Sequence, residues 1–241
     1  MDTSSGIAFF DVDETVIRVK SMFDFLAFWL AEHGDDGSAH AEVMRQVRAM
    51  ADAGVDRTEI NRSYYGRFAG VPAAEVRAVG AEWYQRYRRR PDAFVTATVA
   101  AMAAHRAAGD RVVLVTGSFR PVLDPLMADL GADLALCSEP VVDALGRYTG
   151  DVPTPMIGRN KTAAVRSTMA ALGVDPARCA AYGDHHTDLG MLQAVGRPHV
   201  IANDPALQAV AATAGWPVLP ATAGPHPTSH LRRGGWGSRR G

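Results

Sequence analysis

Short apolar segments alternate with helical segments along most of this chain of 241 residues. Each apolar segment has the length of one buried strand, and the candidate strands cover residues 7–10, 111–115, 133–137, 178–182 and 199–201. Helical periodicity marks the residues between the later strands, at 93–108, 121–130, 161–172 and 188–194. Because a strand followed by a helix is typical of parallel pairing, the pattern predicts an α/β fold, with a parallel sheet flanked by helices.

One long segment interrupts this alternation directly after the first strand. From about residue 21 to 87 the pattern is almost wholly helical, with breaks at glycine-rich positions near residues 34, 54 and 70. We therefore expect a core built from residues 1–19 and 92–219, with residues 20–91 as an inserted helical domain. The chain beyond Pro220 is rich in Gly, Pro, Ser and Arg and lacks apolar periodicity, so residues 220–241 are predicted to be a disordered tail.

Composition excludes some classes of partner. The formal net charge of −1 gives no reason to expect binding to nucleic acid or to an acidic membrane surface. Two isolated cysteines, Cys137 and Cys179, are typical of reduced thiols in a cytosolic protein. No signal peptide is apparent, and the apolar stretch 22–31 is too short to span a bilayer. We expect a cytoplasmic protein whose partner is a small molecule, with neither nucleic acid nor membrane involved.

Two carboxylates follow the first predicted strand. Asp11 and Asp13 are one residue apart, and Thr15 supplies a hydroxyl two positions further on. Alternate residues of a strand share a face, so both carboxylates can reach one point beyond the end of the strand. Like charges this close need a cation or a shared proton between them. The pair therefore predicts a metal ion, a titrating proton, or both.

Three further polar segments lie where predicted strands end or a predicted helix begins: Thr116-Gly117-Ser118, Lys161, and residues 183–188 with Asp184 and Asp188. Open α/β sheets bind ligands at the carboxyl ends of their strands. Carboxylates suit Mg²⁺, while an ammonium and backbone amides suit phosphate oxygens. Each segment alone is compatible with an ordinary helix cap or turn. Together they favour a magnesium-dependent site for a phosphoryl group.

In identity and order these four motifs resemble those of the haloacid dehalogenase (HAD) superfamily of phosphohydrolases. The resemblance spans residues 7–188, and the helical segment between the first two motifs is similar to the C1-type cap of the phosphoserine-phosphatase-like branch, subfamily IB. The family implies a Rossmann-like HAD core with an inserted all-helical C1 cap.

The same resemblance implies a catalytic role for four residues. Asp11 is expected to be the nucleophile that forms an aspartyl-phosphate, and Asp13 the general acid and then the general base. Thr116 is expected to hydrogen-bond a phosphate oxygen, and Lys161 to neutralise the nucleophile and the transferring group.

The remaining site residues follow from the resemblance in the same way. Mg²⁺ is expected to be held by the Asp11 carboxylate, the Asp13 backbone carbonyl and Asp184. The expected supporting residues are Asp188, which anchors Lys161 or the water shell of the metal, and Thr15. Further phosphate- or substrate-binding positions are Gly117, Ser118 and Lys20.

The resulting hypothesis is a Mg²⁺-dependent phosphomonoesterase that hydrolyses a small phosphorylated metabolite through an aspartyl-phosphate. Asp13 disfavours dehalogenation, because a halide leaves without a proton. A phosphotransferase with the same intermediate and a non-catalytic regulator that binds phosphate esters both stay open. So does phosphonate cleavage, which in this superfamily uses a cap lysine, because Lys20 accompanies Lys161 in this chain.

Two departures from the family pattern bear on the substrate. Lys20 stands where phosphoserine phosphatases have the glutamate that binds the substrate ammonium, so phosphoserine is disfavoured. A polyol, a sugar phosphate or a substrate with a second anion fits a cation better. His185 and His186 follow the metal-binding aspartate where small residues are common, and they are expected either to contact substrate or to be exposed. Candidates for a specificity surface in the helical segment are Phe23, Trp29, Tyr64, Tyr65 and Arg67, although packing in the core is favoured for Phe23 and Trp29.

Overall fold

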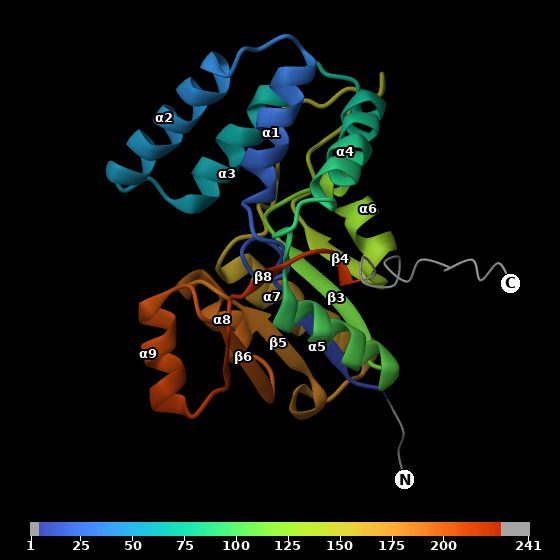
Figure 1. The fold of residues 1–241 in the computed structure, drawn as a ribbon, viewed down its shortest axis with the longest axis vertical. Helices are drawn as coiled ribbons and strands as arrows, with labels where there is room; N and C mark the ends of the chain where they lie inside the picture. The colour runs from blue at the N-terminus through green and yellow to red at the C-terminus, as the bar shows by residue number, and fades with distance from the viewer. Residues whose placement is uncertain (1–4, 228–241) are drawn as a thin grey trace, which may run out of the picture.

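The computed structural model describes residues 5–227, and its centre is a six-stranded sheet (Figure 1). The strand order is β4-β3-β1-β5-β6-β7, and every neighbouring pair runs parallel. The strands are β1 (Ile7–Phe10), β3 (Arg111–Thr116), β4 (Leu134–Cys137), β5 (Ala180–Gly183), β6 (Arg197–Ile201) and β7 (Val218–Leu219). The predicted α/β fold with a parallel sheet is confirmed.

Helices cover both faces of the sheet. They are α5 (Thr96–Ala107), α6 (Arg120–Leu130), α7 (Arg159–Leu172), α8 (Leu189–Leu192) and α9 (Pro205–Ala214), with short 3₁₀ turns η2 (Pro176–Arg178) and η3 (His186–Asp188). Phe10 of β1 packs in one buried cluster with residues of α5 and α6. Phe9, the next residue, packs in a second cluster with residues of α7, α8 and α9. The strands are therefore buried on both sides, which is why they read as continuous apolar runs.

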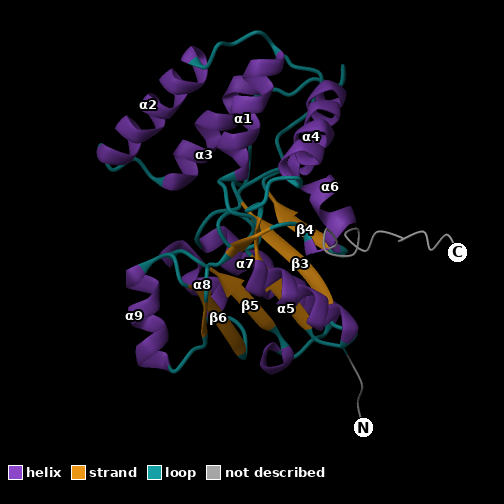
Figure 2. Cartoon of the chain, viewed as in Figure 1, coloured by secondary structure: helices purple, strands orange, loops and turns teal. Residues whose placement is uncertain are grey.

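The segment predicted to be helical lies at one end of the molecule, away from most of the sheet (Figures 1 and 2). It contains α1 (Ser21–Glu32), α2 (Ser38–Asp52), α3 (Arg57–Tyr65), η1 (Gly66–Phe68) and α4 (Ala73–Tyr87). Its aromatic side chains surround Phe119, which precedes α6: the Phe119 ring lies 5.3 Å from Tyr65 and 5.7 Å from Phe25, centroid to centroid. Among the described residues, no helix is both long and apolar enough to cross a membrane.

The helical segment also meets the rest of the chain where α4 crosses α6. At Gly80 of α4, an added Cβ would lie 2.2 Å from the carbonyl oxygen of Pro121. The absence of a side chain therefore allows the two helices to approach closely.

The prediction of a disordered tail from residue 220 was wrong for the part of the tail that the structure describes. Strand β8 (Ala223–Gly224) pairs antiparallel with β2 (Phe94–Val95). Just beyond β8, His226 is 5% exposed and lies 2.8 Å from a carboxylate oxygen of Asp129. A two-residue strand paired to a distant segment has no sequence periodicity that could reveal it. Residues 228–241 of the predicted tail lie outside the described residues.

Candidate active site

A cavity of about 350 Å³ lies between the carboxyl ends of β1, β3 and β5 and the first three helices of the helical segment. It brings together most of the site residues expected from the sequence. Those that line it are Asp11, Asp13, Lys20, Thr116, Gly117, Lys161, Asp184 and Asp188. The sheet explains this convergence, because parallel strands end at one edge.

A buried ammonium joins two carboxylates at the base of the cavity. Lys161, in the first turn of α7, donates to Asp11 Oδ1 over 2.6 Å and to Asp188 Oδ1 over 2.7 Å. The three residues are at most 6% exposed. Asp11 follows β1 and Asp188 ends η3, so the cluster ties three segments of the core together.

Burial and crowding of like charges perturb the protonation of this cluster. Burial, together with the nearby Asp188 and Asp184 carboxylates, raises the pKa of Asp11 well above its usual range, although Lys161 opposes the shift. Burial alone would lower the pKa of the Lys161 ammonium, but Asp11 and Asp188 outweigh it and raise that pKa. Burial and Asp188 also raise the pKa of Asp184. The three carboxylates of Asp11, Asp184 and Asp188 together carry more negative charge than the single Lys161 ammonium can neutralise.

The carboxylate oxygens fit a hard divalent cation. One oxygen from each of Asp11, Asp184 and Asp188 can be chosen so that all three lie within 4.8 Å of one another. Asp188 Oδ2 is buried and has no hydrogen-bond partner among the described residues. Thr15 donates to Asp184 Oδ1 over 2.8 Å and so orients the other oxygen of that carboxylate. Oxygen ligands of this kind suit Mg²⁺. The Asp13 carboxylate is not part of this group.

Asp13 has a different environment from Asp11. Its carboxylate lines the cavity and accepts a hydrogen bond from the backbone N–H of Ser21 over 3.1 Å. Burial raises the pKa of Asp13 to about 6, although the hydrogen bonds from Ser21 oppose the shift. A carboxyl group with this pKa can hold a proton near neutral pH and also release it, as an acid–base catalyst must.

The end of β3 and the loop that follows it present two of the three residues predicted there to the cavity. Thr116 and Gly117 line it, while the carbonyl of Gly117 accepts hydrogen bonds from the Asn61 amide (3.1 Å) and the Tyr65 hydroxyl (2.7 Å). A side chain on Gly117 would meet Ile157 at 2.6 Å. Ser118 is fully buried and is not among the residues that line the cavity. Its hydroxyl instead accepts a hydrogen bond from Ser21 over 2.9 Å.

The candidates for a specificity surface divide between cavity and core. Phe23 lines the cavity, as does Lys20, whose ammonium lies 3.4 Å from Glu14 Oε2. By contrast, Trp29, Tyr64 and Tyr65 are buried in aromatic packing, and the exposed Arg67 donates to Gln46. The core packing favoured for Trp29 is confirmed, and Phe23 packs against the core as well as lining the cavity. The expected place on a specificity surface was wrong for Tyr64, Tyr65 and Arg67, because a helical sequence does not reveal which of its faces meets the core.

Two cavity residues of α3 were not anticipated. Arg57 and Asn61 both line the cavity, as does Ile60 between them. Asp56 caps α3 by accepting from Thr58 N, which puts Arg57 in the first turn. Residues three and four positions apart share a face of a helix. From the sequence, this spacing predicts that Arg57, Ile60 and Asn61 share one face of the helix. It does not predict that this face lines the cavity.

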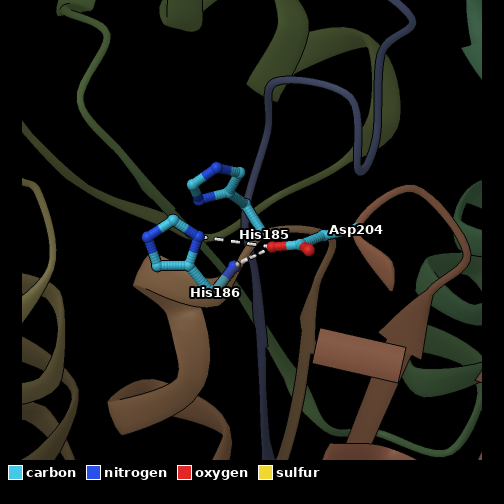
Figure 3. A group of neighbouring side chains, drawn as sticks. All are labelled: His185, His186 and Asp204. Atoms are coloured by element: carbon cyan, nitrogen blue, oxygen red, sulfur yellow. Dashed lines mark hydrogen bonds and ion pairs between the residues drawn. The ribbon is translucent and has the colours of Figure 1, made fainter. Parts of the chain in front are cut away.

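Of the paired histidines, His185 lines the cavity, whereas His186 is not among the lining residues and contacts Asp204 (Figure 3). The backbone N–H and ring Nδ1 of His186 lie 2.8 and 3.3 Å from Asp204 Oδ2. Asp204 also caps α9 by accepting from Ala206 N. His185 lies 3.0 Å from Arg57 Nη1, and burial and then Arg57 lower the pKa of His185 to about 4. His185 therefore stays neutral at physiological pH and links α3 to the core.

Comparison with known proteins agrees with this geometry. Residues 8–193 match the family of haloacid dehalogenase-like hydrolases. The chain is 33% identical to an inhibition of morphological differentiation protein of Streptomyces azureus over 216 residues, 88% of this chain and 77% of that protein. It is 32% identical to a probable phosphatase of Mycobacterium tuberculosis over 215 residues, covering 88% and 74% of the two chains.

Similarity extends to phosphoserine phosphatases and to solved structures. A phosphoserine phosphatase of Halobacterium salinarum is 32% identical over 190 residues, 78% of this chain and 81% of that enzyme. The structure of a protein of unknown function from Bordetella pertussis superposes with a TM-score of 0.80 at 25% identity, covering 90% of this chain and 99% of that one. The chain therefore belongs to the haloacid dehalogenase-like hydrolases, as a phosphatase of their phosphoserine-phosphatase-like branch.

Proposed function

We propose that this phosphatase is a Mg²⁺-dependent phosphomonoesterase that hydrolyses a small phosphorylated metabolite through an aspartyl-phosphate on Asp11. The observation that carries the proposal is the buried group of Asp11, Lys161, Asp188 and Asp184 at the base of one cavity. A purely structural cluster has no need of a cavity above it or of an unpaired carboxylate oxygen within it.

Asp11 is the nucleophile in this proposal. Its carboxylate attacks phosphorus, an O–P bond forms, and the bond between phosphorus and the ester oxygen breaks. Lys161 holds Asp11 in place through the 2.6 Å hydrogen bond and offsets negative charge as the phosphoryl group is transferred. Asp188 in turn positions the ammonium over 2.7 Å.

Asp13 handles the proton in both steps. In its protonated form it gives a proton to the departing alkoxide, which leaves as the alcohol. The resulting carboxylate then takes a proton from water as the water oxygen attacks the aspartyl-phosphate, which releases phosphate and regenerates Asp11. The pKa of about 6 supports both roles.

The remaining residues bind and orient the transferring group. Thr116 and Gly117 line the cavity, where a hydroxyl and a backbone amide are suited to phosphate oxygens. Asp11, Asp184 and the Asp13 backbone would hold Mg²⁺, which supplies positive charge to the phosphate oxygens when it is bound. We further propose that α1–α4 form a cap that excludes bulk water during the reaction. The two cysteines are buried and unpaired, which supports a reducing, cytoplasmic setting.

Phosphate release from a broad panel of phosphomonoesters, measured with Mg²⁺ and again with EDTA, tests the proposal. We expect Mg²⁺-dependent release from at least one ester and none from the Asp11→Asn variant. Free phosphate together with transfer to added alcohols would identify a phosphotransferase instead. No release from any ester would refute catalysis.

A further inference from the structure

Part of the cavity wall is apolar. Beyond the catalytic cluster its walls include Phe23, Val47, Ala51, Ile60 and Ile157. Phe23, Val47 and Ile60 are only partly buried, so each keeps apolar surface open to the cavity. Such surface is stabilised when an apolar group of a ligand covers it.

Asn61, the amide side chain that lines the cavity, is already hydrogen-bonded within the protein. The Asn61 amide nitrogen donates to the Gly117 carbonyl, and its oxygen accepts from the Ser138 hydroxyl. Both ends of this side chain are therefore engaged. A sugar or glycerol moiety lying against Phe23, Val47 and Ile60 would lose hydrogen bonds to water and recover none from these side chains.

The charged side chains on these walls favour a substrate anion over a substrate ammonium. Outside the catalytic carboxylates, the cavity is lined by one acidic side chain, Glu14, and Lys20 lies 3.4 Å from it. A substrate ammonium thus has no unengaged carboxylate to bind. Arg57, in contrast, forms no ion pair with a carboxylate anywhere in residues 5–227, and its guanidinium lies 3.0 Å from the ring nitrogens of His185.

We propose that the substrate is the phosphate ester of an amphipathic alcohol. Its apolar body lies against Phe23, Val47 and Ile60, and its second anionic group, such as a carboxylate, is bound by Arg57. A guanidinium without a carboxylate partner is well suited to this task, because it can bind a planar anion through two parallel hydrogen bonds. The inference rests on the proposed phosphatase reaction and narrows it to one class of ester.

Four esters with related leaving groups test this specificity in the wild-type protein with Mg²⁺: 4-carboxybenzyl phosphate, benzyl phosphate, 4-(aminomethyl)benzyl phosphate and glycerol 1-phosphate. The three benzyl esters differ in charge far from the reacting bond. We expect kcat/KM for the carboxybenzyl ester to exceed that for the aminomethyl ester by about tenfold or more, as for one charge-assisted hydrogen bond. The kcat/KM for benzyl phosphate should also exceed that for glycerol 1-phosphate.

Variants then assign the preference to residues. In Arg57→Gln the ratio of kcat/KM between carboxybenzyl and benzyl phosphate should fall close to one, and Arg57→Lys should retain part of it. In Phe23→Ser the ratio between benzyl and glycerol phosphate should fall. Arg67→Gln is the matched control, because Arg67 is exposed on the same helical segment and contacts Gln46 instead of lining the cavity.

Separate outcomes overturn the two proposals. A wild-type preference for the aminomethyl ester or for glycerol 1-phosphate contradicts the inferred substrate class, even though phosphate is released. So does a carboxybenzyl preference that Arg57→Gln leaves at the wild-type value. Failure to release phosphate from any of these esters or from a broad panel would refute the phosphatase reaction itself, and the substrate inference with it.

Discussion

Replacing Lys161 by methionine removes the ammonium that joins Asp11 to Asp188 while keeping a side chain of similar length. Lys161 is 5% exposed, and its two hydrogen bonds to carboxylates are 2.6 and 2.7 Å long. Removing one partner from a buried ion pair costs about 3–5 kcal/mol, because the other charge stays buried without compensation. Asp11 can take up a proton in response, so we expect a loss near the lower value, about 3 kcal/mol.

Urea unfolding followed by circular dichroism in EDTA measures this loss. With a slope of about 3 kcal/mol per M, a loss of about 3 kcal/mol lowers the unfolding midpoint by about 1 M. Mg²⁺ should recover part of the loss, since a divalent cation replaces the missing positive charge among Asp11, Asp184 and Asp188. We therefore expect a larger Mg²⁺-induced rise of the midpoint in the variant than in the wild type.

Lys20 provides the control, because the chain contains no other lysine besides these two. Its side chain is 51% exposed, and its ion pair with Glu14 is a surface pair at 3.4 Å. Lys20→Met should change the free energy of unfolding by no more than about 0.5 kcal/mol. If Lys161→Met unfolds at the same urea concentration as the wild type in EDTA, the buried ammonium does not stabilise the carboxylate cluster and the reasoning is wrong.

Three further outcomes are expected. Asp11→Asn should lower phosphate release at least about 1,000-fold while the circular dichroism spectrum stays that of the wild type, since an amide cannot form the aspartyl-phosphate; release above 1% of the wild-type rate would contradict the nucleophile assignment. EDTA should abolish phosphate release and Mg²⁺ restore it, whereas activity that persists after dialysis against EDTA would argue against a divalent cofactor. Gly80→Ala should destabilise the protein by about 1–3 kcal/mol in urea unfolding, because its Cβ would meet the Pro121 carbonyl at 2.2 Å; Gly66→Ala, whose Cβ would have no neighbour within 4 Å, is the control and should show no such loss.

Much of the site could be predicted because its residues occupy positions with a fixed geometric meaning. Asp11 and Asp184 each follow a parallel strand and Thr116 is the last residue of one, and such strands end at one edge of the sheet whatever their exact order. The alternation of strands and helices could also be predicted, because local periodicity indicates which face of an element is buried. Predictions that rested on this logic agree with the structure.

Predictions failed where the outcome depended on a partner elsewhere in the chain. Tyr65 has a hydroxyl and a large ring that could contact a substrate. In the structure its hydroxyl donates to the Gly117 carbonyl and its ring packs on Phe119. Strand β8 exists because Phe94 and Val95 offer it hydrogen bonds, and its own two residues carry no pattern. Periodicity identifies a buried face but not what covers it.

The parallel sheet, the helical segment after β1 and the order of the charged motifs along the chain could all be predicted from local sequence. The ion pair between Lys161 and Asp11, which are 150 positions apart, and the place of Arg57 in the same cavity became apparent from the folded chain alone. This division arises because secondary structure follows from local burial patterns. Burial, ion pairing and the resulting pKa shifts depend instead on which distant side chains are packed together.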